Sequence, residues 1–546
     1  MRFGSVLSTL ALAALAAPAP AQQAAPGFTP GDFRAHVEFL SSDLMEGRDT
    51  GTRGYDLAAS YVATRFQGLG LTPAAAGGGF LQNVPFAAYR VNGPASLTIG
   101  GRAFAHGADV LINPPQSDAP LRMTVPLVFA GYGLDLPAQG FNDYAGLDVR
   151  GKAVVVLSGY PQGVASELGA HLSSSKARMA GARGAVATIV IGTAASMART
   201  PWERQVERAG EPSLTWLDPA GKPFDNAPGL RFQAYAHTPA AQALFTGAPR
   251  TLDQVLAEAA RPNGRPKGFA LRPTVGVDAR SAAVRTRSPN VVAMLPGSDP
   301  KLANEYVLLM AHLDHVGVKP AAAPGGDTIH NGAMDNASGI ATMLEVARAM
   351  TEAGTRPKRP IIFAAVTAEE KGLLGSQYLA KNPLPGIGGT GGKIVGVVNL
   401  DMPVLLYDFS DVIAFGGEHS TLGATAARAA ANMGLKVSPD PIPEEGIFTR
   451  SDHYRFVQEG VPSIFLMTGF AGQGEARFRD FLKTHYHRPS DSTALPFDWA
   501  SGAKFAAINY AIAREIADAA QAPRWYRGDF FGDTFAGGQP KAAPAR

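Results

Sequence analysis

Apolar residues in the segment 32–68 recur at helical spacing on either side of a polar loop. The first stripe contains Phe33, Val37 and Leu40, and a second stripe follows the loop 45–51. Positions three and four apart lie on one face of a helix, so each stripe can be buried while the opposite face remains in water. The pattern predicts two amphipathic helices.

The pattern changes after Ser288, where near-continuous apolar runs are separated by segments with helical spacing. The runs occupy residues 291–295, 306–311, 361–366, 394–400 and 463–467. Runs of this kind are typical of strands buried on both faces, and strands that alternate with helices form parallel sheets. We therefore predict an α/β fold, with a mostly parallel sheet sandwiched by helices.

The stretch 120–288 has a different texture. It contains short β-type runs such as 125–130 and 153–157, with many glycine and proline residues between them. Short strands separated by turn residues indicate a smaller, β-rich unit. The predicted division is a signal segment at 1–21, a first part of the main domain at 22–119, an insertion at 120–288, the rest of the main domain at 289–520, and a C-terminal tail at 521–546.

The composition fits a globular protein and argues against a nucleic-acid partner. Of the 546 residues, 46% are hydrophobic and 17% are charged, which supplies enough apolar material for more than one core. The formal net charge of +3 is too small to create the concentrated field that nucleic acid or an anionic membrane requires.

The first 21 residues have the layout of a secretory signal. Arg2 precedes an apolar run at 6–17, and Ala19-Pro20-Ala21 forms a small-residue end. The run is too short to cross roughly 30 Å of hydrocarbon, so we expect export with cleavage and no membrane span. The absence of cysteine excludes disulfides and a lipid on an N-terminal cysteine. We expect a periplasmic or extracellular location.

Candidate chemistry follows three of the apolar runs directly. His312 ends the run 306–311, Glu369 and Glu370 follow 361–366, and Asp401 follows 394–400. The carboxyl ends of parallel strands meet at one edge of a sheet, where ligands gather. Singly, each residue has an ordinary explanation as a helix cap or a core histidine. Together, crowded carboxylates would repel one another unless cations lay among them, so the pattern favours a metal site.

Two polar loops complete the candidate set. The loop 331–339 precedes an apolar helix that Asn336 or Ser338 can cap, which leaves Asp335 free to face the site. The loop 485–491 offers His485 and His487, and one can be a ligand without the other.

These motifs resemble, in order and content, the co-catalytic di-zinc exopeptidases related to bacterial leucyl aminopeptidases and glutamate carboxypeptidase. The matching segments are 312–314, 334–339, 369–376, 399–402 and 486–491, with 46–48 near the N-terminus. The region of the short strands 125–130 and 153–157 is similar to the protease-associated domain that such enzymes carry as an insertion. The resemblance implies a zinc exopeptidase fold of the phosphorylase/hydrolase-like type, interrupted by this domain.

The resemblance also implies roles for individual residues. Asp335 would bridge two Zn²⁺ ions per chain, with His312 and Asp401 on one ion and Glu370 and His487 on the other. Glu369 would act as the catalytic base on a water held between the metals. Two imidazoles favour zinc over magnesium or calcium.

Other residues in these motifs receive weaker predictions. Asp314, two positions along the strand from His312, could orient its imidazole. Asp452 and His453 lie in a polar loop that is either a wall of the substrate pocket or an ordinary loop. His315 is a weaker candidate, and His485 competes with His487, which the family pattern favours.

The resemblance favours an aminopeptidase acting on peptide substrates, and the layout of the first 21 residues adds that it is exported. Alternatives on the same scaffold are a carboxypeptidase or a glutaminyl cyclase. The alternative from another class is a metal-dead binding or receptor module, since a fold alone does not establish an activity.

Overall fold

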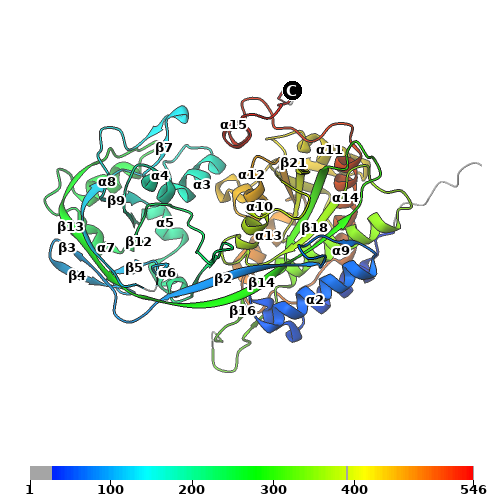
Figure 1. Ribbon diagram of the computed structural model, residues 1–546, viewed down its shortest axis with the longest axis horizontal. Coiled ribbons are helices and arrows are strands. Elements are labelled where there is room, and N and C mark those ends of the chain that lie inside the picture. The colour runs from blue at the N-terminus through cyan, green and yellow to red at the C-terminus, as the bar shows by residue number, and fades with distance from the viewer. Residues whose placement is uncertain (1–26, 118, 322, 389–390, 545–546) are drawn as a thin grey trace, which may run out of the picture.

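The computed structural model describes residues 27–117, 119–321, 323–388 and 391–544, which form two bodies side by side (Figure 1). The signal segment predicted at 1–21 lies outside the described residues. Within these ranges, no helix combines the length and apolar character that a membrane crossing requires.

The larger body is built on a ten-stranded sheet. Its strands, in spatial order, are β11 (Ser213–Trp216), β2 (Leu81–Val91), β14 (Ser281–Leu295), β18 (Ile361–Val366), β15 (Glu305–His312), β19 (Lys393–Leu400), β22 (Ser463–Thr468), β20 (Asp411–Phe415) and β21 (Lys436–Ser438), with β1 (Thr72–Pro73) paired to β14. The central strands β18, β15, β19 and β22 are parallel, but β11, β2, β14 and β20 join antiparallel. The sheet is therefore mixed, and the predicted parallel arrangement holds at its centre.

Both faces of this sheet are covered by helices, which confirms the α/β prediction. In β15, Val307 and Leu309 pack into one core cluster, while Leu308 and Met310 pack into another on the opposite face. The first face is covered by α1 (Pro30–Leu40), α2 (Arg53–Gly68), α9 (Ser338–Glu352), α11 (Leu422–Asn432) and α14 (Trp499–Asp518). The second face is covered by α10 (Leu374–Lys381) and α12 (His453–Val457).

The helices α1 and α2 are those that the N-terminal stripes predict. Thr29 caps α1 by accepting a hydrogen bond from the Asp32 N–H, and Pro30 suits the first turn because its missing N–H would be unpaired there. Phe33, Val37 and Leu40 are fully buried. The loop between the helices contains a 3₁₀ segment, η1 (Asp43–Arg48).

The smaller body contains an eight-stranded sheet. In spatial order its strands are β4 (Arg102–Ala105), β3 (Ser96–Ile99), β13 (Phe269–Ala279), β6 (Leu121–Phe129), β9 (Ala153–Leu157), β10 (Ala187–Ile191), β12 (Phe232–Ala236) and β5 (Val110–Ile112). Helices α3 (Ser166–Ser174), α4 (Lys176–Ala182), α7 (Thr238–Leu244) and α8 (Leu252–Ala259) contribute to its cores. The similarity of this body to a protease-associated domain stays a prediction.

Some strands near the predicted domain bounds belong to the other body from the one that their predicted range indicates. Strands β3, β4 and β5 fall within 22–119, yet they belong to the smaller sheet. Strand β11 falls within 120–288, yet it pairs with β2 of the larger sheet. Short strands carry little information about their partners, because pairing depends on contacts that are distant in sequence.

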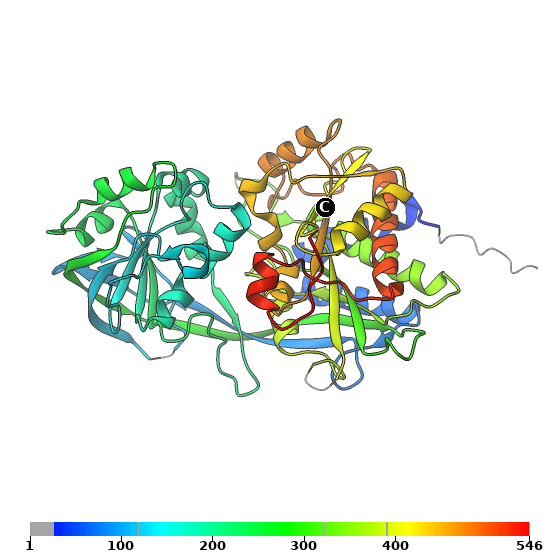
Figure 2. The same cartoon turned by 90° about the horizontal axis from the view of Figure 1, so that it is seen from above.

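A two-stranded ribbon joins the bodies. Strands β2 and β14 are paired from Leu81–Val291 to Val91–Ser281, and each continues directly into a strand of the smaller sheet, β3 and β13 respectively. Figure 1 shows this ribbon running beneath both bodies, and Figure 2 shows it from above.

Candidate metal centre

Three neighbouring parallel strands deliver their terminal residues to the same edge of the larger sheet. His312 is the last residue of β15, Asp401 follows β19, and Glu369 and Glu370 lie shortly after β18. Because β18, β15 and β19 are adjacent and parallel, these side chains converge.

Asp335 and His487 reach this edge from two loops. Asp335 lies in a turn before α9, and His487 lies between α13 (Gly474–Thr484) and α14. The Asp335 carboxylate is buried between two imidazoles. Its Oδ1 is 3.2 Å from Nε2 of His312, and its Oδ2 is 3.1 Å from Nε2 of His487.

The donor atoms form two groups that share Asp335, and within each group they lie within 4.8 Å of one another. The first group contains His312, Asp335 and Asp401, and the second contains His315, Asp335, Glu370 and His487. The structure thus brings together all five residues that the resemblance implies as ligands. It also adds His315.

The spacing of the donor atoms suits cations. His312 Nε2 lies 3.2 Å from an oxygen of Asp401, and His487 Nε2 lies 3.1 Å from an oxygen of Glu370. Ligands held tetrahedrally at roughly 2.0–2.1 Å from zinc are separated by about 3.3 Å, whereas charge-assisted hydrogen bonds measure about 2.7–2.9 Å. The buried Nε2 of His487 makes no hydrogen bond to any described residue, despite two carboxylates nearby. The residues therefore fit a pair of zinc ions.

The electrostatics of the cluster favour positive charge. Burial lowers the pKa of His487, but the carboxylates of Glu370 and Asp335 outweigh burial and raise this pKa to about 11. Burial raises the pKa of Glu370, but the imidazoles of His487 and His315 together outweigh burial and lower this pKa to about 2. The same attraction that holds a proton on the imidazole would act on a divalent cation.

Glu369 faces a cavity beside these groups and belongs to neither of them. The cavity has a volume of about 290 Å³. Its lining comprises His312, Asp335, Glu369, Asp401, Met402, Ile442, Glu445, Ile447, Arg450, Ser451, Phe465, Met467, Phe478, Leu482 and Tyr486. Burial raises the pKa of Glu369 well above its usual range, and the His312 imidazole opposes this shift. A carboxylate with a high pKa beside a reaction space is suited to taking up a proton.

Asp314 supports the glutamates with its side chain and His312 with its backbone. The Asp314 carboxylate accepts hydrogen bonds from the N–H groups of Glu369 at 3.0 Å and Glu370 at 3.3 Å. His312 Nδ1 lies 3.1 Å from the Asp314 carbonyl oxygen. The expectation that the Asp314 side chain orients His312 is therefore corrected. That carboxylate is turned toward the residues after β18, the neighbouring strand, and pairs with their N–H groups.

Asp452 and His453 lie behind the cavity and are fully buried. His453 begins α12, and its ring packs against Phe448 and Phe465. The cavity wall is formed instead by the preceding residue, Ser451, whose hydroxyl donates to Asp401 Oδ2 at 2.6 Å.

His315, a weaker candidate from the sequence, lies in the second donor group. Its Nδ1 is 2.9 Å from Glu370 Oε1, and its ring meets the His487 ring edge-on. The imidazole can therefore position Glu370 or join the second donor group. The signal was present, because His315 follows the motif 312–314 by one residue.

The side chains of Arg48 and Asp491 hold the backbone around Asp335 in place through hydrogen bonds. The buried Arg48 guanidinium donates to the carbonyl oxygens of Leu40, Leu313, Asn331 and Gly332. The Asp491 carboxylate accepts from the N–H groups of Met334 at 2.8 Å and Asp335 at 3.0 Å. These contacts explain why the segments 46–48 and 486–491 accompany the ligand motifs.

His485 lies away from the donor groups. Its Nδ1 is 3.0 Å from the Ser490 hydroxyl, within its own loop. The geometry therefore favours His487 in the choice that the sequence leaves between the two histidines.

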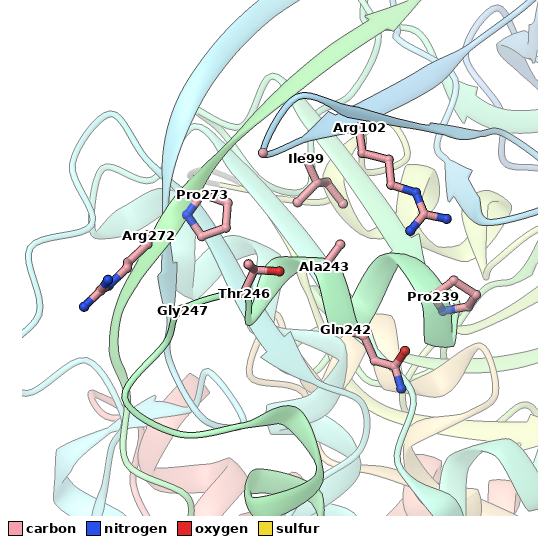
Figure 3. Close-up of a pocket in the computed structure, with 10 residues that line it drawn as sticks. Ile99, Arg102, Pro239, Gln242, Ala243, Thr246, Gly247, Arg272 and Pro273 are labelled. Atoms are coloured by element: carbon pink, nitrogen blue, oxygen red, sulfur yellow. The ribbon is translucent and has the colours of Figure 1, made fainter.

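A larger cavity of about 700 Å³ lies in the smaller body (Figure 3). Its lining includes Arg102, Gln242 and Thr246, but no histidine or carboxylate among the described residues. It therefore lacks the groups that proton transfer or zinc binding would need.

The comparisons with known proteins find a family model that spans both donor groups. Residues 290–513 match Peptidase family M28. Leupeptin-inactivating enzyme 1 of Streptomyces exfoliatus is 33% identical over 186 residues, which cover 33% of this chain and 36% of that protein. The probable leucine aminopeptidase 2 of Aspergillus oryzae is 32% identical over 190 residues, which cover 34% of each protein. The chain thus spans about a third of the length of these curated relatives.

Among solved structures, an aminopeptidase from Aneurinibacillus sp. strain AM-1 aligns with a TM-score of 0.49 and 20% identity. The alignment covers 90% of this chain and 94% of that one.

Proposed function

Residues 290–513 match Peptidase family M28, and from that match and the geometry of the site we propose that the chain is a di-zinc exopeptidase that removes residues from the N-terminus of peptides. The observation that carries the proposal is the position of Asp335. One buried carboxylate reaches both imidazoles, His312 and His487, and so links two donor groups into a single site.

The donor set points to zinc. His312, Asp335 and Asp401 would hold one ion, and Asp335, Glu370 and His487 the other. Bound there, the ions supply an acidified water and a polarised scissile carbonyl.

Glu369 is the proton carrier in this proposal. Its carboxylate takes a proton as the water oxygen bonds to the carbonyl carbon. It then delivers that proton to the amine nitrogen as the C–N bond breaks. The Asp314 carboxylate fixes the Glu369 backbone at 3.0 Å, which holds the base at the cavity.

The cavity supports attack at a chain terminus. A space of about 290 Å³ accommodates one residue more readily than an extended polypeptide. Its cation, Arg450, is already paired with Glu445 at 2.8 Å, so the lining offers little to a substrate's terminal carboxylate. The Glu369 carboxylate, which also lines the cavity, instead suits a free ammonium group. The relative named as a probable leucine aminopeptidase agrees with this direction.

The proposal includes export to the periplasm or the medium. It rests on the pattern of the first 21 residues, which lie outside the described part of the chain.

Metal analysis and a paired substrate test this function. We expect about two zinc ions per chain and hydrolysis of leucine 4-nitroanilide, but not of its N-acetyl form. Asp401→Asn should lose zinc and turnover. The matched control Asp408→Asn, whose carboxylate is 82% exposed, should lose neither. Preference for the acetylated substrate, or absence of zinc after reconstitution, would overturn the proposal.

A further inference from the structure

One wall of the candidate substrate cavity is a loop that rests on the smaller body. Residues 442–451 supply Ile442, Glu445, Ile447 and Arg450 to the lining. The loop consists of two short 3₁₀ turns, η4 (Pro443–Glu445) and η5 (Ile447–Thr449). Both turns contact helix α3 of the smaller body. The loop therefore lies between the cavity and α3. Figure 1 shows α3 at the side of the smaller body that is nearest to α12.

The packing of α3 on this loop is close at one point. Gly446 has a φ of 56°, and a Cβ added there would lie 3.3 Å from the Cβ of Ala170 in α3. Little space remains between the two backbones, so a shift of α3 would also displace the loop 442–451.

A buried hydrogen bond fixes α3 beside the cavity. His171 of α3 and Tyr454 of α12 are both buried, and His171 Nδ1 lies 2.5 Å from the Tyr454 hydroxyl. Burial lowers the pKa of His171 to about 4, so this bond joins a neutral imidazole to the phenol. The Tyr454 N–H donates to the carbonyl of Ser451, whose hydroxyl in turn holds Asp401.

An ion-pair cluster fixes the other end of the contact. His419 Nε2 lies 2.7 Å from Glu167 of α3, and Nδ1 lies 2.6 Å from Asp529 in the C-terminal tail. These distances are those of charge-assisted hydrogen bonds and are shorter than the 2.9–3.2 Å between each histidine and its nearest carboxylates in the candidate metal groups. His419 is therefore an imidazolium that joins the two bodies and the tail.

Aromatic rings from the tail close the same junction. Phe531 of α15 (Phe530–Phe535) packs against His419, Tyr454 and Phe448. Phe448 belongs to η5 of the wall loop. The junction thus joins α3, the wall loop and the tail; Figure 2 shows α15 at the side of the larger body that faces the smaller one.

From these contacts we propose that α3 of the smaller body is a positioning element for substrate binding. Its contacts with η4 and η5 hold the wall loop 442–451 in its binding shape, and His171 and Glu167 anchor α3 there through Tyr454 and His419. The inference rests on the proposed exopeptidase function and adds an element from outside the peptidase domain. A preformed wall binds substrate more tightly, because less of the loop has to be ordered on binding.

The test compares His171→Phe, Tyr454→Phe, the double variant and Glu167→Gln with the parent protein. Each single variant should raise KM about fivefold, the typical effect of one lost hydrogen bond, with kcat within about twofold and zinc content unchanged. The KM of the double variant His171→Phe/Tyr454→Phe should be no higher than that of His171→Phe or Tyr454→Phe alone, because each of these three proteins lacks the same hydrogen bond. Asp278→Asn is the control, since it removes one carboxylate from an exposed ion pair of the smaller body, with Arg122 at 3.1 Å.

Amide hydrogen exchange of residues 442–451 gives a readout that does not depend on turnover. We expect faster exchange of the wall loop in the three single variants and no change in Asp278→Asn. Unchanged exchange, or an unchanged KM accompanied only by a lower Tm, would overturn the inference. An inactive parent whose loop still loosens in the variants would refute the exopeptidase function and leave the support of the loop by α3 intact.

Discussion

The carboxylate of Asp491 accepts a hydrogen bond from the backbone N–H of Asp335 at 3.0 Å, so a residue far along the chain holds the shared ligand from behind. A second N–H, that of Met334, donates to the other oxygen of the same carboxylate. Both oxygens are therefore engaged in shaping the loop that presents Asp335.

Asp491→Asn should weaken zinc binding without removing a ligand. The amide offers one acceptor oxygen where the carboxylate offers two, so one buried N–H loses its partner. We expect the zinc Kd to rise about 10- to 100-fold, the usual effect of changing a group that supports a ligand. Titration against a competing chelator measures this. Asp480→Asn, on the exposed surface of α13, is the control; equal affinities in all three proteins would remove Asp491 from this role.

Glu369→Gln and Glu370→Gln should separate two functions in adjacent residues. Glu369→Gln should retain two zinc ions while kcat falls by about 10²- to 10⁴-fold, because the base is lost and the ligands remain. Glu370→Gln should release zinc from the group that contains His487. Metal analysis beside steady-state kinetics distinguishes them, and the opposite pattern would mean that the two roles are exchanged.

Asp335→Ala should lose at least one zinc ion per chain, and more metal than Asp401→Ala. Asp335 belongs to both donor groups, whereas Asp401 belongs to one. Metal analysis after dialysis against a weak chelator provides the measurement, with the exposed Asp408→Ala as control. Two ions retained in Asp335→Ala would exclude it as the shared ligand.

The junction at His419 should weaken at alkaline pH. Burial lowers the pKa of His419, but the hydrogen bonds that its ring donates to the carboxylates of Asp529 and Glu167 outweigh burial and raise this pKa to about 10. Folding raises this pKa from its unfolded value of about 6.5, so protonated His419 stabilises the folded state. This stabilisation is complete below about pH 6.5 and is lost as the pH rises toward 10. Glu418 also faces the imidazole, at 3.9 Å, and its charge favours the protonated form.

His419→Gln isolates this effect. The difference in Tm between parent and variant should be largest near pH 6.5 and should shrink steadily up to pH 10. The comparison is needed because burial lowers the pKa of Lys176 to about 7, which makes stability rise over the same range. Thermal unfolding at several pH values gives the result, and a difference that does not depend on pH would contradict an imidazolium at the junction.

The sequence predicts the core and the site edge for a physical reason. A strand buried on both faces needs an apolar side chain at every position, so the runs that become β15, β18 and β19 are visible without a structure. The first polar residue after each run must lie at the sheet edge. His312 and Asp401 could therefore be placed from the pattern, with the ligand set then following from the family resemblance.

The groups that support the site could not be predicted in the same way. Arg48 and Asp491 act on backbone N–H and carbonyl groups, which every residue carries and which leave no pattern in the sequence. The direction of the Asp314 side chain depends on where the chain turns after β18. The assignment of the short strands β3 and β11 to their sheets depends on partners that only the fold reveals.

The ribbon of β2 and β14 restricts how the two bodies can move. Both strands leave the larger sheet together and remain hydrogen-bonded up to the smaller one. A single-stranded linker would allow rotation about individual backbone bonds. Here any opening must bend a paired ladder whose hydrogen bonds resist shear, so the expected motion is a shallow flexing about one axis with no free swivelling.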